Sequence, residues 1–408
     1  MPSDFPLGNL PLGDLPLGDL PLVDAHCHPV FVGSPGSAGS AGSVDRGEFE
    51  RMLGEADRPA PVGVSYADSL LGAAVRRWCA PPLGLPAGAP LDRYLDRRAD
   101  LGPVEVARRL LGAAGLSYLL VDTGIGGADG ADSDWWSVQG LASAADAVGR
   151  EVVRLESVAE GLADSGVAAA DFADAYVDAL AKATRNAAAV KSILGYRHGF
   201  DVDPRRPSRA EVTVAARDWL RRRQEAGAAQ SIASRARLSD EALLRFVLWS
   251  GVDRGLPVQL HTGFGDRDLR LPSVNPALLQ PMVEAVEAVG TPLVLLHCYP
   301  YQREAGWLAA VYPHVYVDVG LTVGQVGAQA GAVLAEFCEL APFGKLMFST
   351  DAYRLAERYL VGAAQFRHSF GRLLRDWWRD GDLTARDVER VAVMVGADNA
   401  RRLYAIDG

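Results

Sequence analysis

Short apolar runs alternate with longer amphipathic segments along most of this chain, and each pattern predicts one kind of element. Short, nearly continuous apolar runs rich in Val and Leu are typical of strands that are covered on both faces. The first run ends at Val23, directly before the polar stretch 24–29. Seven further strands are predicted at residues 116–122, 151–158, 187–194, 256–262, 292–298, 315–321 and 345–351.

The segments between these runs predict helices, because apolar residues recur in them at helical spacing. They cover residues 137–149, 171–186, 209–226, 239–254, 276–289, 303–311 and 325–340 and a tail from 355 to 403, with Ser239 as an expected N-cap. Eight strands, each followed by helical material, predict an α/β protein with a (β/α)8 TIM-type barrel. The alternative is an open doubly wound sheet, but no Gly-x-Gly-x-x-Gly loop follows the first strand.

Two parts of the chain depart from this alternation. Residues 1–20 repeat the motif PLGDL with period five, and the proline in every unit prevents a regular helix. Residues 33–43 are rich in Gly and Ser, and residues 48–109 are mostly helical in pattern. We therefore expect residues 1–20 to be a flexible lead and residues 21–408 to be a single barrel domain, in which residues 30–115 form a mostly helical insertion.

Composition narrows the class of protein. The chain of 408 residues is 49% hydrophobic and 23% charged, which suits a globular protein with a large core. A net charge of −10 argues against nucleic acid and against an anionic membrane surface as partners. The four cysteines show no Cys-x-x-Cys spacing, no apolar run is long enough to span a membrane, and no secretory signal is present. We expect a cytoplasmic protein that acts on a small molecule. The sequence leaves open whether the protein forms a homo-oligomer.

Candidate chemistry gathers at the ends of the predicted strands. His26 and His28 are two residues apart, so on an extended strand their side chains share one face and can hold one metal ion. Lys191, His261, His297 and Asp351 lie at the ends of later strands. Each alone could be an ordinary core histidine, a solvated lysine or a helix cap. Together they predict a metal site, because a barrel brings the carboxyl ends of its strands to one mouth.

The order His-x-His, Lys, His, His, Asp over a barrel resembles the amidohydrolase superfamily. The stretches VDAHCHP, LPVQLHTGFGDRDL, LVLLHCYPYQREAGWLA, VYVDVGL and LMFSTDA resemble the amidohydrolase-2 group. They are most similar to the domain that is fused to glutamine synthetase-like domains in FluG- and nodulin-type proteins. The resemblance covers about residue 20 to the C-terminus, is strongest in residues 256–352 and excludes the PLGDL repeats.

The resemblance implies a role for each candidate residue. His26, His28 and His261 would be metal ligands, and Asp351 would be both a ligand and a proton shuttle. His297 would bind a second metal or donate a hydrogen bond to the substrate. Lys191 falls where many superfamily members carry a carbamylated lysine that bridges two metals. We expect a divalent metal, with zinc favoured over manganese or iron, bound as one ion or two.

Arginine and tyrosine residues near the same strand ends suggest how a substrate binds. Arg197, Arg270 and Arg303 follow predicted strands, and an arginine fork suits a carboxylate. Tyr301 could line the same mouth. We therefore expect substrate contacts from Arg197, Arg270, Tyr301 and Arg303.

Two reaction classes fit this ligand set. The first is hydrolysis of an amide or amidine-type C–N bond, not of the peptide backbone, in a small carboxylate-bearing substrate, which the fused relatives suggest is glutamyl-amide-like. The second is metal-dependent non-oxidative decarboxylation of the amidohydrolase-2 type. A non-catalytic binding barrel is disfavoured, because no ligand position is missing.

Overall fold

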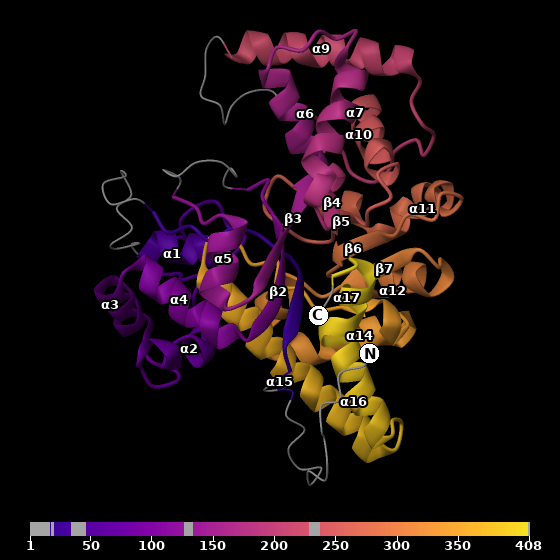
Figure 1. The fold of residues 1–408 in the computed structure, drawn as a ribbon. Coiled ribbons are helices and arrows are strands. Elements are labelled where there is room, and N and C mark those ends of the chain that lie inside the picture. Colours follow the sequence, from indigo (N-terminus) through magenta and orange to yellow (C-terminus); the bar gives the residue numbers. More distant parts are fainter. Residues whose placement is uncertain (1–16, 18–19, 34–45, 126–133, 228–236, 407–408) are drawn as a thin grey trace.

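The computed structural model describes residues 17, 20–33, 46–125, 134–227 and 237–406. Eight parallel strands pair in sequence order to form a nearly closed barrel, with helices around it (Figure 1). The predicted (β/α)8 architecture is therefore confirmed. The strands are β1 (Leu22–Cys27), β2 (Leu116–Asp122), β3 (Val148–Arg154), β4 (Ala189–Ser192), β5 (Val258–Thr262), β6 (Leu293–His297), β7 (Val315–Asp318) and β8 (Leu346–Met347).

The first and last strands approach each other where β1 ends and the chain leaves β8. The Asp351 N–H donates to the His26 carbonyl (2.9 Å), and the His28 N–H donates to the Ala352 carbonyl (2.8 Å). These backbone bonds hold the segment after β8 against the segment that carries the histidine pair. Residues 324 and 325 positions apart in the chain are thereby fixed side by side.

The barrel contains a small interior core that is separate from the large core between the strands and the helices. Its members come from six of the strands and from the C-terminal segment: Val23, Ala25, Tyr118, Leu120, Val152, Ala188, Ala189, Val294, Leu296, Met347, Ala397, Ala400, Tyr404 and Ile406. The C-terminal segment includes α17 (Asn399–Leu403), which contacts β1 and β8. It therefore closes one end of the barrel interior with apolar side chains.

The helices cover the strands from outside. They are α5 (Val138–Ala145), α6 (Leu155–Asp164), α7 (Phe172–Ala183), α8 (Leu194–Arg197), α9 (Arg209–Gly227), α10 (Glu241–Val252), α11 (Gln280–Glu287), α12 (Gln302–Val311), α13 (Thr322–Val326), α14 (Ala330–Leu340), α15 (Ala356–Asp380) and α16 (Ala385–Val393). Figure 1 shows α6, α7, α9 and α10 packed together as a group at one side of the barrel, and contacts within the group agree.

The insertion after β1 is helical in its described part, as predicted. It contains α1 (Arg46–Leu53), α2 (Leu70–Trp78), α3 (Leu91–Leu101) and α4 (Pro103–Ala114). Helix α4 packs against α15, so the insertion is anchored to the last long helix. The predicted flexible lead and Gly/Ser loop lie outside the described residues, apart from Leu17, Leu20 and Gly33.

Several predicted boundaries were wrong. The strand expected at 151–158 is β3 and ends at Arg154; residues 155–164 form α6, because Leu155, Ala159 and Leu162 repeat at helical spacing. The helix expected at 137–149 ends at residue 145, since residues 148 and 149 already pair with β2. The N-cap of α10 is Asp240 rather than Ser239: its carboxylate accepts the N–H groups of residues 242 and 243.

The last two strands are shorter than predicted. Strand β7 ends at Asp318 instead of residue 321, and β8 contains only Leu346 and Met347 of the expected 345–351. Beyond these points the backbone turns, with positive φ at Leu321 and Asp351, to deliver polar groups to the barrel mouth. The tail from 355 is helical, with breaks near residues 381–384.

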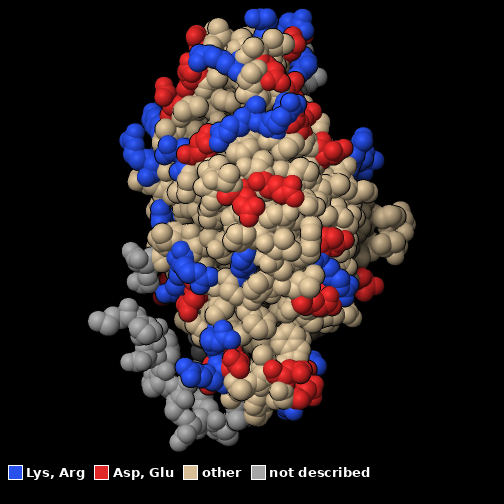
Figure 2. Space-filling view, turned by 90° about the vertical axis from the view of Figure 1, so that its right-hand side faces the viewer, with Lys and Arg blue, Asp and Glu red and all other residues tan. Residues whose placement is uncertain are grey.

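The outer surface carries both signs of charge. On the face in Figure 2, basic and acidic side chains are interspersed, without one extended patch of a single sign. The four cysteines lie in the described part of the chain and are free thiols. Within the described ranges, every helix is too short or too polar to cross a membrane. The cytoplasmic location, the small-molecule partner and the homo-oligomer stay predictions.

Candidate metal centre

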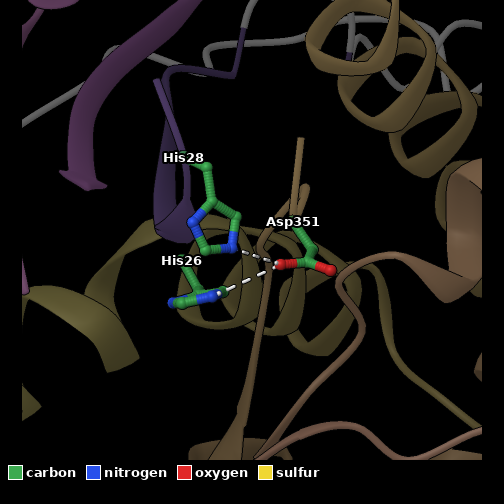
Figure 3. Close-up of side chains that lie close together, drawn as sticks. All are labelled: His26, His28 and Asp351. Atoms are coloured by element: carbon green, nitrogen blue, oxygen red, sulfur yellow. Dashed lines mark ion pairs between the residues drawn. The ribbon is translucent and has the colours of Figure 1, made fainter. Parts of the chain in front are cut away.

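Three predicted ligands meet at the mouth of the barrel. The Nε2 atoms of His26 and His28 each lie 3.3 Å from the same atom, Oδ1 of Asp351 (Figure 3). One ligand atom from each residue lies within 4.8 Å of the others, and all three side chains are buried. Ligand atoms bound to one ion at about 2 Å stand at comparable separations. The geometry therefore fits a single divalent cation.

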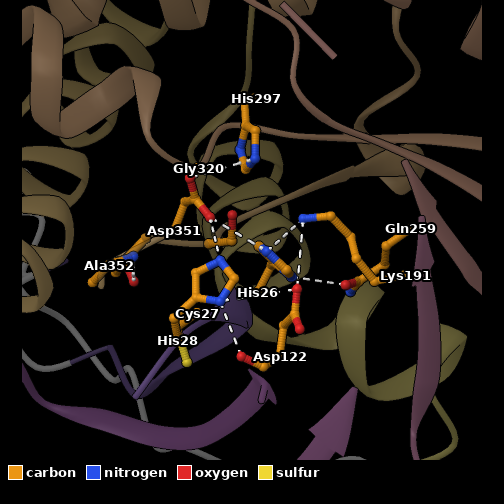
Figure 4. Close-up of polar contacts among 12 residues, drawn as sticks. His26, Cys27, His28, Asp122, Lys191, Gln259, His297, Gly320, Asp351 and Ala352 are labelled. Carbon is orange, nitrogen blue, oxygen red and sulfur yellow. Dashed lines mark hydrogen bonds and ion pairs between the residues drawn. The ribbon is translucent and has the colours of Figure 1, made fainter. Parts of the chain in front are cut away.

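The two histidines present their Nε2 atoms because their Nδ1 atoms are already used. Nδ1 of His26 lies 2.8 Å from Oε1 of Gln259, and Nδ1 of His28 lies 3.0 Å from the carbonyl of Asp122 (Figure 4). Both partners are acceptors, so each Nδ1 carries the proton and donates. Nε2 of each ring is therefore unprotonated and can serve as a ligand atom, the tautomer that ligating histidines adopt.

Strand geometry alone would not bring all these side chains together. In β6, Leu293 and Leu295 belong to the outer core, whereas Val294 and Leu296 face the interior. Strict alternation would turn His297 outward, yet its ring lies 4.7 Å from that of His261. A left-handed backbone conformation at His297 (φ 69°) changes its direction.

That unusual conformation is held by its neighbours. The carboxylate of Asp318 accepts the N–H of His297 (2.8 Å), and the hydroxyl of Thr322 donates to the His297 carbonyl (2.8 Å). Asp351 also has a positive φ (48°), and its N–H is bonded to β1. Non-glycine residues in this conformation are uncommon and concentrate at functional sites.

His261 and His297 stand beside the three ligands with nitrogens that have no partner among the described residues. Nε2 of His261 and both ring nitrogens of His297 are buried without a hydrogen bond. Nε2 of His297 lies 3.5 Å from Oδ2 of Asp351, the oxygen not shared by the histidine pair. Buried polar atoms are rarely left unsatisfied, so these nitrogens favour a ligand or a bound ion at this place. The predicted roles of His261 and His297 as ligands stay predictions.

Lys191 enters the same space from β4. Its Nζ lies 2.9 Å from Nε2 of His26 and 4.0 Å from Oδ2 of Asp122, and its side chain is buried. Burial lowers the pKa of Lys191. The Lys191 amine thus shares the lone pair that a metal would use on His26, and carbamylation of this lysine stays a prediction.

Burial sets the protonation of the site. It lowers the pKa of His26 to about 4 and that of His261 to about 3, so both rings are neutral at neutral pH. Burial alone would raise the pKa of Asp351, but His297 and the contacts from His26 and His28 lower it well below its usual range. Neutral imidazoles beside an ionised carboxylate are the donor set that a divalent cation requires.

Some important residues escaped the sequence analysis. Asp122, at the end of β2, is buried and accepts a hydrogen bond from Arg154 Nη2 (2.7 Å), at the end of β3. Asp318 and Gln259 hold His297 and His26 in place. The signal for Asp122 was present, because it ends the predicted strand 116–122. Arg154 and Asp318 lay inside predicted strands that were drawn too long, so their place at a strand end was hidden. Gln259 gave no signal, because it lies in the middle of β5.

The residues predicted to bind substrate are scattered. Arg303 lies on α12, pairs with Glu336 and Glu339 of α14, and is 56% exposed. Arg270 is exposed, and the Tyr301 hydroxyl donates to the Leu271 carbonyl. Arg197 pairs with Glu160 of α6 (3.2 Å). Contact of all four with a substrate stays a prediction, and only Arg197 is largely buried among them.

A parallel eight-stranded barrel with buried histidines and an aspartate at its mouth defines an enzyme scaffold of the metal-dependent amidohydrolase type. Comparison with known proteins agrees: a family model described as amidohydrolase, of the amidohydrolase-2 group, matches residues 23–406. The chain belongs to this family.

Individual relatives are consistent with that membership. Protein fluG of Emericella nidulans is 33% identical over 228 residues, which are 53% of this chain and 25% of fluG. The chain therefore spans about a quarter of the length of that relative. A crystal structure from Lactobacillus casei, provisionally described as a metal-dependent hydrolase, is 25% identical with a TM-score of 0.78 and 95% of both chains covered.

A more distant structure shares the fold alone. The uronate isomerase of Thermotoga maritima aligns with a TM-score of 0.59 over 95% of both chains, at 13% identity.

Proposed function

We propose that this chain is a metal-dependent hydrolase that cleaves an amide or amidine-type C–N bond, not a peptide backbone, in a small carboxylate-bearing substrate. The observation that carries the proposal is the placement of Asp351. One of its oxygens faces the Nε2 atoms of His26 and His28, and the other faces His297.

The two oxygens of the Asp351 carboxylate therefore have different roles. Oδ1 of Asp351 completes the metal site with the two histidines, and Oδ2 remains directed at His297, at 3.5 Å. A bound divalent ion supplies a water whose pKa falls from 15.7 to about 7. Asp351, ionised in this setting, accepts a proton from a water placed beside it and returns it to a leaving nitrogen.

A leaving amine requires such a proton, and so an aspartate at the nucleophile suits C–N hydrolysis. His297 supports the same chemistry, because its buried nitrogens have no other partner among the described residues. Burial lowers the pKa of His297 and keeps its ring neutral, and with the single proton on Nε2 that N–H would donate to a substrate oxygen as charge develops there.

Family membership supports the class, and the Lactobacillus casei relative supports metal dependence. A glutamyl-amide-like substrate is suggested by the resemblance to domains fused with glutamine synthetase-like partners. Zinc is the proposed ion, with manganese or iron as alternatives.

The test compares two reactions in one preparation. Metal content is measured in the purified protein, which is then incubated with γ-glutamyl amides and, separately, with aromatic carboxylates. Amine or ammonia release that disappears on chelation and returns with metal is the expected result. Carbon dioxide from the aromatic acids without amine release would identify a decarboxylase instead, and a metal-free active enzyme would contradict the proposal.

A further inference from the structure

A buried arginine lies near the metal centre on an element that the sequence pattern described only as a helical tail. Arg358, in the first turn of α15, is 6% exposed. Its Nη2 donates to Oε1 of Glu55 (2.8 Å), a residue of the insertion after β1. Its Nη1 is buried and has no hydrogen-bond partner in the described part of the chain.

Tyr353 connects this pair to the metal ligands. The guanidinium carbon of Arg358 stands 4.0 Å from the centre of the Tyr353 ring, a cation–π contact. The same ring meets the ring of His28 edge-on, with centroids 6.5 Å apart. Arg358 and Glu55 therefore lie one aromatic ring away from a predicted metal ligand, a distance that a substrate side chain of a few carbons can span.

The open hydrogen-bonding capacity of this pair is of two kinds. Nη1 of Arg358 is an unused donor of a positively charged group. Besides Arg358, Glu55 has only weak described contacts at its two oxygens, to Gln325 Nε2 and to the Tyr353 hydroxyl, each at 3.4 Å. Nη1 of Arg358 can donate to a carboxylate, and the Glu55 carboxylate can accept a hydrogen bond from an ammonium group.

Charge balance decides which ligand fits both. The Arg358–Glu55 pair is neutral as a unit, so a ligand that places a carboxylate on Arg358 and an ammonium group on Glu55 leaves both side chains paired in this largely buried place. A zwitterionic head group does this and adds no net charge. We infer that Arg358 and Glu55 bind the α-carboxylate and α-ammonium groups of a free amino-acid head group, with Tyr353 beneath it.

This inference rests on the proposed function and makes its substrate class narrower. The reacting C–N bond would lie at the far end of the amino-acid side chain, beside His28 and Asp351. The structure thereby assigns the carboxylate contact to Arg358 rather than to Arg303, which is engaged by Glu336 and Glu339.

Three ligands that cannot be hydrolysed test the inference by calorimetry on the metal-loaded protein. L-glutamate has both head-group charges, glutarate lacks the ammonium, and 4-aminobutanoate lacks the α-carboxylate. All three keep a distal carboxylate that can reach the metal. L-glutamate is expected to bind about 10- to 100-fold more tightly than either truncated compound, the usual effect of one charge-assisted hydrogen bond.

Two variants separate the charges. Arg358→Met is expected to weaken binding of L-glutamate and glutarate by about 10- to 100-fold and to leave 4-aminobutanoate unchanged. Glu55→Gln is expected to weaken L-glutamate and 4-aminobutanoate and to spare glutarate. Arg209→Met, which removes an exposed arginine paired with Asp174, is the control and should change none of the three.

The unaffected ligand in each variant shows that the protein remains folded. Equal loss of all three ligands in Arg358→Met would overturn the inference, and so would wild-type binding of L-glutamate no tighter than that of the truncated compounds. If the three ligands bind in the expected order of affinity but no amide is hydrolysed, the head-group site stands and the proposed hydrolase function is contradicted. If amides that bear a carboxylate but no α-ammonium group are hydrolysed and the expected order of ligand affinities is absent, the head-group site is contradicted and the proposed function stands.

Discussion

Gln259 offers the sharpest test of how the fold prepares the metal site. Its Oε1 accepts from Nδ1 of His26 (2.8 Å), and its Nε2 donates to the Ala25 carbonyl (2.8 Å) and to the Tyr404 hydroxyl (2.9 Å). Gln259→Met keeps the side-chain length but removes all three contacts. The His26 ring then loses the acceptor that fixes its Nε2 lone pair toward the metal.

Both stability and metal affinity should fall. At about 1 kcal/mol for each hydrogen bond, the free energy of unfolding should decrease by roughly 3 kcal/mol. Metal affinity should decrease by about 10- to 100-fold, the usual effect of losing a partner of a ligating histidine. Chemical denaturation of the metal-free protein measures the first, and competition with a chelator measures the second.

Gln365→Met is the matched control. Gln365 is also buried, donates to the Ser369 hydroxyl (2.7 Å) and accepts from Nε1 of Trp78 (3.3 Å), but none of these residues is a predicted ligand. Its replacement should lower stability and leave metal affinity unchanged. The reasoning is refuted if Gln259→Met loses stability like the control while binding metal as tightly as the wild type.

Four further outcomes are expected. His26→Ala and His261→Ala should each lose bound metal and activity while the far-ultraviolet circular dichroism spectrum is kept; unchanged metal content would exclude that residue as a ligand. Asp351→Asn should still bind metal but turn over about 10²–10⁴-fold more slowly, and near-normal turnover would place the proton acceptor elsewhere. The metal-free protein should lose stability as the pH falls from 6.5 toward about 4, because the unfolded chain then takes up protons on His26, His261 and His297 that the native barrel does not. His26→Asn should reduce this slope in denaturation curves without abolishing it, and an unaltered slope would count against the assignment. Gly265→Ala should impair activity, because its Cβ would lie 2.0 Å from the Tyr196 hydroxyl and 3.2 Å from Nε2 of His261. Adding Tyr196→Phe should restore part of the activity. Unchanged kcat and KM in Gly265→Ala would show that the loop relaxes to accommodate the added methyl group.

Much of the site was predictable because strand ends are easy to recognise in a parallel barrel. An apolar run followed by His, Lys or Asp marks the place where the chain reaches the mouth, and Lys191 and His261 were identified in this way. The same rule applied to the predicted strand 116–122 would have found Asp122, one partner of a buried ion pair with Arg154. Asp122 was overlooked although it ends a predicted strand, and Arg154 was missed because the predicted strand ran on to residue 158.

Other features could not be predicted from local pattern. The direction of His297 depends on a left-handed backbone conformation that strand periodicity does not reveal. The contact between Arg358 and Glu55 joins residues 303 positions apart, and only the docking of the insertion on α15 creates it. Arg303 was selected because it follows a strand end, yet it begins a helix whose neighbour α14 supplies two glutamates.

The C-terminal segment inside the barrel gives the metal centre a remote reporter. Tyr404 is linked to His26 through a single residue, Gln259, so interactions that order the histidine also order residues 399–406. By thermodynamic linkage, metal bound at the barrel mouth stabilises the conformation in which residues 399–406 remain packed inside the barrel. Hydrogen exchange at the backbone amides of α17 should therefore slow as metal is added, and the exchange rate would measure occupancy of the site without any substrate.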